Sequence, residues 1–414
     1  MCFDVHCERL SKRVAAVRRR VSYLAVTLLL GLAPLSASAA GTVLPGTPVP
    51  VGFVGVNVDG PMLTPADNVN LASQGDLMVA SGVQSVRVAF NWAAAQPYRS
   101  WADVPPGQAS AFRNGVGNVP TSFATTDQLV RLAVHRGLTV LPTVLYAPTW
   151  DATTRPGRWV AALNKAGPYA NFLTTLIRRY GPHGSFWSSN PSVRRNPIRM
   201  WQIWNEENDA NYWPQPFAGS YVALLRAASG AIRSADPGAK VVLGALTQLV
   251  WTSLGQIYAI PGARRLFDVV AVNAFTATPS RLIWFLHLVR RSMAAAGDPN
   301  KPMLDTEVSW PSALDQSSQS YSWNTTERGQ ARDVGQTLPI LAAQRKELRL
   351  LGFYYYTWMG AEYPRAPSFN FGGLLRYDIS GQIVAKPALA VFKQFALELE
   401  RCREKGRLAT QCLN

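Results

Sequence analysis

Short apolar runs alternate with amphipathic segments along most of this 414-residue chain. The runs are nearly continuous in Val, Leu and Ile, which is typical of parallel strands covered on both faces. They predict eight strands, at residues 51–58, 85–92, 138–146, 198–204, 240–246, 268–275, 302–306 and 349–358. Apolar residues at helical spacing predict helices at residues 67–81, 125–136, 167–180, 219–234, 280–296, 327–347 and 387–401.

Eight strands, most of them followed by a helix, predict an α/β fold: a (β/α)8 TIM barrel. A composition of 48% hydrophobic and 16% charged residues is normal for a globular protein, and the length is ample for a barrel. The barrel is expected to form one domain over residues 51–400. A Gly- and Pro-rich lead-in at 41–50 precedes it and a tail at 401–414 follows it.

The first 40 residues have the layout of a secretory signal peptide. A basic segment ending at Arg20 is followed by an apolar run at 21–33 and by small residues at 37–39. The apolar run has 13 residues, fewer than the roughly 20 that a spanning helix needs. The sequence therefore predicts a secreted protein without a stable membrane span after cleavage, an uncleaved anchor being the alternative.

Cysteines and charge add little further chemistry. Cys2 and Cys7 lie in the leader, so Cys402 and Cys412 are expected to form a disulfide, idle thiols being the alternative. The four histidines are scattered, and neither a metal nor another cofactor is expected. The net charge of +16 fits either binding of anionic polymers or plain solubility. No nucleic-acid-binding motif is present, and a monomer is expected.

Active sites of such barrels lie at the C-terminal ends of the strands. The predicted ends carry many amides, carboxylates and aromatic rings: Asn57, Asp59, Asn91, Trp92, Tyr146, Trp150, Asn205, Glu206, Trp213, Trp251, Asn273, Phe275, Glu307, Trp310, Tyr356 and Trp358. Aromatic rings can lie against the flat C–H faces of sugars, and amides can bind their hydroxyls. The set indicates a carbohydrate cleft, although some of the rings are expected only to fill the top of the barrel.

Two predicted strands end on glutamates in similar contexts. The run WQIWNEEN, which starts at Trp201, reaches Glu206, and the run KPMLDTEVSW, which starts at Lys301, reaches Glu307. Two carboxylates across one cleft fit glycoside hydrolysis, with one as general acid and the other as nucleophile. The like charge of Glu207 is expected to raise one pKa. Strand periodicity places Asp305 on the same face as Glu307.

These motifs resemble clan A of the glycoside hydrolases, in particular families 5 and 39, over roughly residues 52–395. The resemblance implies retaining hydrolysis, with Glu206 as acid/base and Glu307 as nucleophile. It also implies that Asn205 binds the 2-hydroxyl of the sugar and that Arg87 supports the nucleophile. Trp358 would form the floor of the sugar subsite.

One motif departs from this family pattern. Members usually have a His-x-Tyr pair at the end of strand six, whose tyrosine contacts the nucleophile, whereas this chain has Asn273, an alanine and Phe275. Phenylalanine cannot donate that hydrogen bond, and Tyr355 or Tyr356 is a candidate to replace it. The complete set of candidate substrate-binding residues is Asn205, Arg87, Trp358, Asn273, Trp150, Tyr356 and Trp310.

The sequence thus predicts a secreted retaining glycoside hydrolase that acts on a polysaccharide or oligosaccharide through two glutamates. The alternative is a carbohydrate-binding barrel with weak or no turnover, which the altered end of strand six would favour. A metal-dependent deacetylase or an esterase would need clustered histidines or a Gly-x-Ser-x-Gly motif, and the sequence has neither.

Overall fold

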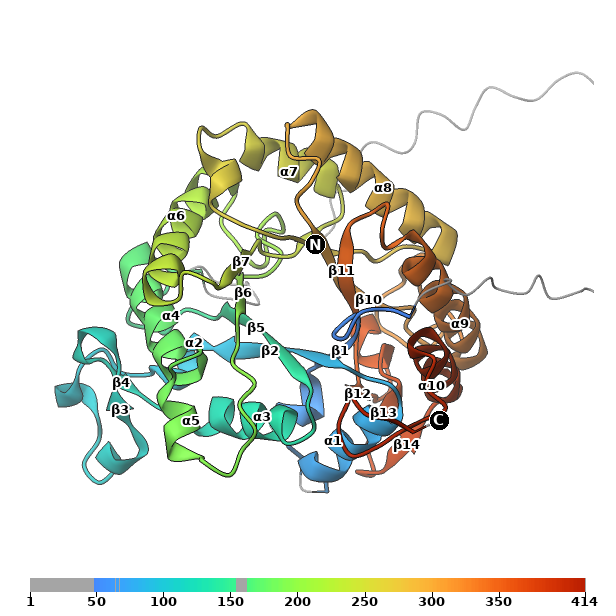
Figure 1. The fold of residues 1–414 in the computed structure, drawn as a ribbon, viewed down its shortest axis with the longest axis horizontal. Helices are drawn as coiled ribbons and strands as arrows, with labels where there is room; N and C mark the ends of the chain where they lie inside the picture. The colour runs from blue at the N-terminus through green and yellow to red at the C-terminus, as the bar shows by residue number, and fades with distance from the viewer. Residues whose placement is uncertain (1–47, 64, 67, 154–161, 414) are drawn as a thin grey trace, which may run out of the picture. The chain divides into compact units, whose positions relative to one another are not determined.

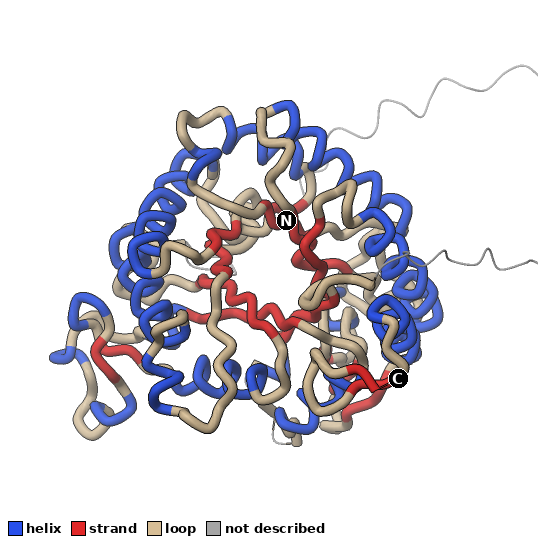
Figure 2. The backbone as a smooth tube through the Cα atoms, viewed as in Figure 1, coloured by secondary structure: helices blue, strands red, loops and turns tan. Residues whose placement is uncertain are grey.

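The computed structural model describes residues 48–63, 65–66, 68–153 and 162–413. The predicted signal peptide and most of the lead-in lie outside the described residues. Within the described part, the helices form an outer ring around an inner ring of strands (Figures 1 and 2). No helix there is long and apolar enough to cross a membrane.

The inner ring is a parallel sheet in the order β7-β6-β5-β2-β1-β11-β10-β9-β8. Its strands are β1 (Val54–Val58), β2 (Ser85–Asn91), β5 (Thr139–Leu145), β6 (Met200–Ile203), β7 (Lys240–Val242), β8 (Leu246–Thr247), β9 (Val270–Asn273), β10 (Met303–Val308) and β11 (Leu350–Tyr355). The predicted strand at 240–246 is divided into β7 and β8. A bridge from Val242 to Val269 joins β7 to the segment that leads into β9 and closes the ring. The predicted (β/α)8 barrel is confirmed.

Eight helices of the outer ring cover the strands: α1 (Leu71–Ala80), α3 (Ala124–Val134), α4 (Ala166–Tyr180), α6 (Ala218–Ala235), α7 (Val250–Tyr258), α8 (Pro279–Ala295), α9 (Glu327–Gln344) and α10 (Pro387–Glu400). Helix α7 was not predicted. Its buried residues Val250, Leu254 and Ile257 do have helical spacing, but it has only nine residues, one of them Gly255. Such a short pattern is a weak helix signal.

Short helices and strands lie in the loops and the tail outside the barrel. The longest loops contain α2 (Trp92–Ala95), α5 (Ser185–Ser189), β3 (Arg113–Asn114), β4 (Pro120–Thr121), β12 (Met359–Ala361), β13 (Leu375–Tyr377) and β14 (Ile383–Ala385). In the tail, β15 (Glu404–Lys405) pairs with β16 (Cys412–Leu413). The sulfurs of Cys402 and Cys412 are bonded there, with their Cα atoms 5.2 Å apart.

The core is divided between the two sides of the strands. Most buried apolar side chains lie between strands and helices, whereas a small cluster that includes Leu141, Val242, Ala271, Leu304 and Tyr354 occupies the other face of the sheet. Inward-facing positions nearer the C-terminal ends of the strands are polar instead. This change along the barrel interior creates the floor of a polar site.

Candidate active site

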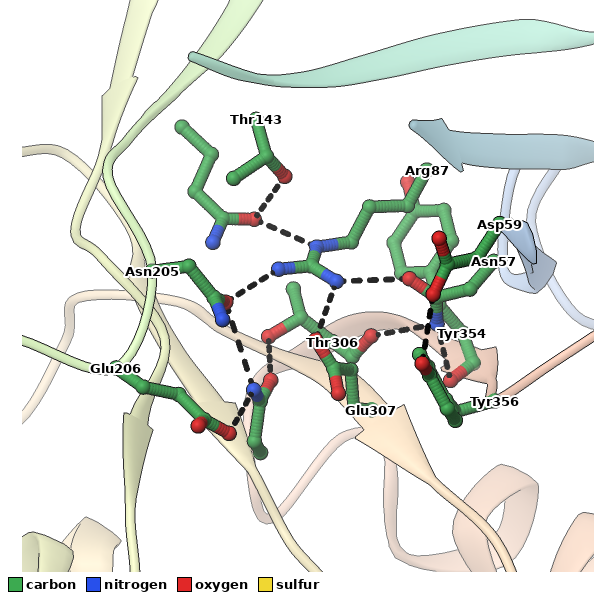
Figure 3. Close-up of polar contacts among 12 residues, drawn as sticks. Asn57, Asp59, Arg87, Thr143, Asn205, Glu206, Thr306, Glu307, Tyr354 and Tyr356 are labelled. Atoms are coloured by element: carbon green, nitrogen blue, oxygen red, sulfur yellow. Dashed lines mark hydrogen bonds and ion pairs between the residues drawn. The ribbon is translucent and has the colours of Figure 1, made fainter. Parts of the chain in front are cut away.

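Arg87 is the centre of a hydrogen-bonded network inside the barrel (Figure 3). It lies on β2 and is 5% exposed. Its Nη1 donates to Glu307 Oε1 at 2.7 Å and to Asn57 Oδ1 at 2.7 Å, while Nη2 donates to Asn205 Oδ1 at 2.7 Å. Its Nε donates to Gln202 Oε1 at 2.9 Å. Because buried charges are tolerated when paired and hydrogen-bonded, this guanidinium can hold residues from three other strands in fixed positions.

A β-bulge directs Glu307 into this network. On β10, Asp305 lies opposite Val272 and Glu307 lies opposite Asn273, with a register shift between them. Val272 packs in the core between strands and helices, so Asp305 faces outward with it. Glu307 faces the barrel interior, where Arg87 contacts it. The expectation that Asp305 shares a face with Glu307 was wrong, because a bulge adds one residue to the alternation.

Glu206 and Asn205 are positioned by a strained turn at the end of β6. Trp204 and Glu206 have left-handed φ angles of 69° and 49°, which cost roughly 1–3 kcal/mol each for residues other than glycine. Asn273 Nδ2 on β9 donates to Glu206 Oε1 at 2.7 Å and lies 3.5 Å from Asn205 Oδ1. The turn therefore presents two successive side chains to the site, which a regular strand cannot do.

The two glutamates belong to one continuous chain of hydrogen bonds. It runs from Glu206 through Asn273, Asn205 and Arg87 to Glu307. Thr306 Oγ1 donates to Asn273 Oδ1 at 3.0 Å, which fixes the amide so that its Nδ2 can face Glu206. The structure thus brings together the two predicted carboxylates and three of the predicted substrate-binding residues.

The surroundings of the two glutamates differ. Burial, and after it the charge of Glu307, raises the pKa of Glu206 to about 8, partly offset by the Asn273 hydrogen bond. Burial also raises the pKa of Glu307, but the charge of Arg87 and its hydrogen bond oppose that rise. Because Arg87 contacts Glu307 and not Glu206, a proton shared by the pair favours Glu206. Within the pair, Glu206 is therefore the better proton donor and Glu307 the better carboxylate.

The expected like-charge effect between the neighbouring glutamates falls on Glu207, whose pKa is raised by burial and, to a lesser extent, by the charge of Glu206, and not on Glu206. Glu207 is fully buried, and a Cβ added at Gly244 would lie only 2.1 Å from its Oε2. Burial raises its pKa to about 8, so it is neutral at pH 7. The charge that raises the pKa of Glu206 most is that of Glu307.

A small cavity of about 100 Å³ opens beside this network. It is lined by Asn57, Val58, Asp59, Arg87, Val88, Ala89, Thr143, Leu145, Tyr146, Asn205, Tyr212, Glu307 and Tyr356. Of the predicted aromatic residues, Tyr146 and Tyr356 lie here, and the Tyr356 hydroxyl donates to Asp59 Oδ2 at 2.6 Å. Amides, carboxylates and phenol rings thus surround a space next to Glu307.

The predicted tryptophans lie elsewhere. Trp358 is 0% exposed, and its Nε1 donates to Gln74 Oε1 on α1 at 2.9 Å. Trp310 is 1% exposed. Trp150 is half-buried, and its Nε1 donates to the Gln96 carbonyl at 2.8 Å. Since a ring without exposed surface cannot contact a sugar, the expected roles of Trp358 and Trp310 were wrong, and Trp150 is not part of the cavity lining.

Neither Tyr355 nor Tyr356 takes the place of the tyrosine that family members have at the end of strand six. Tyr355 accepts a hydrogen bond from Gln330 Nε2 on α9 at 3.0 Å, and Tyr356 is bonded to Asp59. Phe275 instead joins an aromatic cluster of Phe275, Tyr321, Trp323, Tyr356 and Phe369, whose rings are 4.6–6.2 Å apart. Sequence reasoning missed this cluster and the cavity residue Tyr212, because they come from loops without periodic patterns.

No group of three or more His, Cys, Asp or Glu side chains that could hold a metal ion occurs in the described part of the chain.

Comparison with known proteins relates the chain to glycosidases through its fold. No protein-family model and no curated protein matches the sequence. Solved structures do match. A monomeric β-xylosidase from Caulobacter crescentus CB15 is 17% identical with a TM-score of 0.58, over 84% of this chain and 69% of that one. A GH39 enzyme from Xanthomonas axonopodis pv. citri is 17% identical with a TM-score of 0.58, over 84% and 67%.

The catalytic domain of a GH53 protein from Ignisphaera aggregans is 20% identical with a TM-score of 0.54, and the match covers 84% of this chain and 97% of that one. The chain therefore has the barrel fold of the clan A glycoside hydrolases. At these identities the similarity concerns the fold, and the chemistry has to be argued from the site itself.

Proposed function

We propose that this protein is a retaining glycoside hydrolase in which Glu206 is the general acid/base and Glu307 is the nucleophile. The observation that supports this most strongly is the hydrogen-bonded network in which Arg87 contacts Glu307 while Asn273 contacts Glu206. It holds two carboxyl groups of different protonation preference in one network, and Glu307 of this pair lines the cavity. That asymmetry is what double displacement at an acetal requires.

In the first step, a carboxylate oxygen of Glu307 attacks the anomeric carbon and the bond to the leaving oxygen breaks. Glu206 gives its proton to that oxygen, and a covalent glycosyl ester on Glu307 results. In the second step, Glu206, now ionised, takes a proton from water. The oxygen of this water displaces Glu307 from the anomeric carbon and restores both side chains.

The polar lining of the cavity is suited to a carbohydrate. Asn205 can use its amide hydrogens and Asn57 a remaining lone pair for sugar hydroxyls. The phenol of Tyr146 can donate or accept, and that of Tyr356, which donates to Asp59, can accept. The neighbouring aromatic cluster around Phe275 offers apolar ring surface for a further sugar unit. A polysaccharide or an oligosaccharide is accordingly the proposed substrate.

Export completes the proposal. The signal-peptide pattern of the first 40 residues agrees with the disulfide between Cys402 and Cys412, since disulfides persist in oxidising compartments. Expression of the full chain in its native host, followed by mass spectrometry of the protein in the medium, tests this. A mature N-terminus after Ala39 or Ala40 is expected, and a full-length chain retained in the cell would contradict export.

Kinetics with two leaving groups test the catalytic roles. For Glu206→Gln, turnover of aryl glycosides with poor leaving groups should be abolished, while those with good leaving groups keep a measurable first step, because they need no acid. For Glu307→Gln, turnover of both should be lost. The exposed Glu347 provides a matched control, and Glu347→Gln should keep the wild-type rates. Wild-type rates in both site variants would refute the assignment.

A carbohydrate-binding barrel without turnover is the second candidate. The observation in its favour is Phe275, which leaves Glu307 without a tyrosine donor at that position. Calorimetry of the wild-type protein with oligosaccharides distinguishes the two proposals. Binding heat without any released sugar over several days would favour the binding protein, and measurable product would favour the hydrolase.

A further inference from the structure

Asp59 is a third carboxylate of the cavity, and the proposed reaction does not use it. It directly follows β1 and lines the cavity together with Glu307. The hydroxyl of Tyr356 donates to its Oδ2 at 2.6 Å, which fixes the orientation of the carboxylate. The side chain is partly exposed, and a carboxylate has several acceptor positions, so it retains capacity to accept hydrogen bonds from a ligand.

The cavity has no spare positive charge to balance Asp59. Among the described residues that line it, Arg87 is the only cation. The guanidinium of Arg87 already donates to Glu307 and to three side-chain amides. An anionic ligand would therefore meet Asp59 and Glu307 while the nearest cation is engaged elsewhere.

The neighbouring phenols show the effect of this negative charge. Burial, and after it the charge of Asp59, raise the pKa of Tyr146 to about 12. Burial and then Asp59 also raise the pKa of Tyr356. Both phenols are consequently protonated at all physiological pH values. Tyr146 can donate to a ligand oxygen, whereas the hydrogen of Tyr356 is already donated to Asp59. The lining thus combines neutral donors with one fixed acceptor.

We propose that Asp59 determines the class of sugar that enters the cavity: it accepts hydrogen bonds from hydroxyl or ammonium groups of an uncharged or amino sugar, and it excludes sugars that carry a carboxylate. The proposal rests on the sugar-binding part of the proposed function, because the sugar is taken to occupy the cavity beside Glu307. Physically, a hydroxyl or ammonium donor gains a charge-assisted hydrogen bond, whereas a uronate is repelled in a partly dehydrated space.

Matched pairs of aryl glycosides test the proposal, with glucoside against glucuronide and galactoside against galacturonide. Each pair differs only in a CH₂OH or a carboxylate at C5. We expect the wild-type protein to prefer the neutral member by at least about 100-fold in kcat/KM, the scale of one lost charge-assisted hydrogen bond together with repulsion. In Asp59→Asn, kcat/KM for the neutral member should fall about 10- to 100-fold and the neutral-to-uronate preference should shrink about tenfold.

The control variant is Asp315→Asn, which makes the same charge change at an exposed residue with a left-handed φ of 59°, a conformation that asparagine tolerates. It should leave the preference unchanged. Binding of the same pairs to Glu307→Gln, measured by calorimetry, reports the preference without turnover.

The outcomes separate the two proposals. If wild type hydrolyses neutral glycosides but Asp59→Asn lowers both members of each pair equally, Asp59 is structural and the specificity proposal is overturned. A wild-type preference for the uronate also overturns it, while leaving the hydrolase assignment intact. If the wild type hydrolyses neither but the Glu307→Gln protein binds the neutral members selectively, the hydrolase proposal fails and the specificity proposal stands. Absence of binding to any pair overturns both.

Discussion

Removal of the Asn273 amide should change the pH dependence of the proposed hydrolase activity in a defined direction. Asn273 Nδ2 donates to Glu206 Oε1 at 2.7 Å, and this hydrogen bond favours the ionised form of Glu206. Asn273→Ala therefore raises the pKa of Glu206 above its value of about 8. Activity needs Glu206 protonated, so it is lost as the pH rises through this pKa, and the alkaline limb of kcat/KM should move to higher pH.

The size of the shift in pH follows from the strength of the hydrogen bond between Asn273 and Glu206. A hydrogen bond to a charged group contributes about 1.5–3 kcal/mol, and one pKa unit corresponds to about 1.4 kcal/mol. The alkaline limb should therefore move up by about 1 to 2 pH units. Because Asn273 also opposes the rise in the pKa of Glu307, the acidic limb should move to higher pH as well.

The assay is the pH profile of kcat/KM for an aryl glycoside, measured for the wild type and two variants. Asn300→Ala is the control, since it removes the same amide at an exposed residue that does not line the cavity. Its alkaline limb should stay within about half a pH unit of the wild type. An alkaline limb of Asn273→Ala that is unchanged, or that lies at lower pH, would refute the assignment of Glu206 as the acid.

Three further predictions concern buried groups. Arg87→Met should lower the free energy of unfolding by about 3–5 kcal/mol in urea denaturation, because it leaves Glu307 buried without its cation. It should also move the acidic limb of the kcat/KM profile to higher pH, and an unchanged acidic limb would contradict the role of Arg87. Trp358→Phe should cost about 1–3 kcal/mol of stability through the lost contact with Gln74 but leave KM unchanged; a large increase in KM would show that the ring contacts substrate. Glu207 holds a proton in the folded state that the unfolded chain loses above pH 4.5, so its contribution to stability falls as the pH rises toward 8. Between pH 4.5 and 7, the free energy of unfolding of Glu207→Gln should therefore rise by about 3 kcal/mol relative to that of the wild type. A difference between the two proteins that does not change with pH would contradict a buried, neutral Glu207.

The barrel and its pair of glutamates could be predicted because both leave simple marks in the sequence. Strands buried on both faces read as unbroken apolar runs, and an abrupt polar end on such a run identifies a strand end at the active-site face. Glu206 and Glu307 follow two such runs, and Arg87 is a single charge inside a third. These residues form one network in the structure.

The features that were missed arise from irregular backbone and from tertiary contacts. The bulge before Glu307 and the left-handed φ angles at Trp204 and Glu206 break the alternation of side chains between the two faces of the sheet. No pattern in the sequence predicts either feature. Trp358 turns outward because Gln74 on a distant helix offers an acceptor. Loop residues such as Tyr212 reach the cavity through chain paths that periodicity cannot describe.

The central claim is that Glu307 attacks an anomeric carbon while Glu206 protonates the leaving oxygen. Incubation with a 2-deoxy-2-fluoro aryl glycoside that has a good leaving group tests it most directly. The fluorine slows both formation and release of the glycosyl ester, and the good leaving group restores formation alone, so the ester accumulates. Mass spectrometry of the digested protein should find one fluorosugar on the peptide that contains Glu307, and none in Glu307→Gln. A label on Glu206 or on any other residue, or no label in a protein that hydrolyses the parent glycoside, would contradict the account.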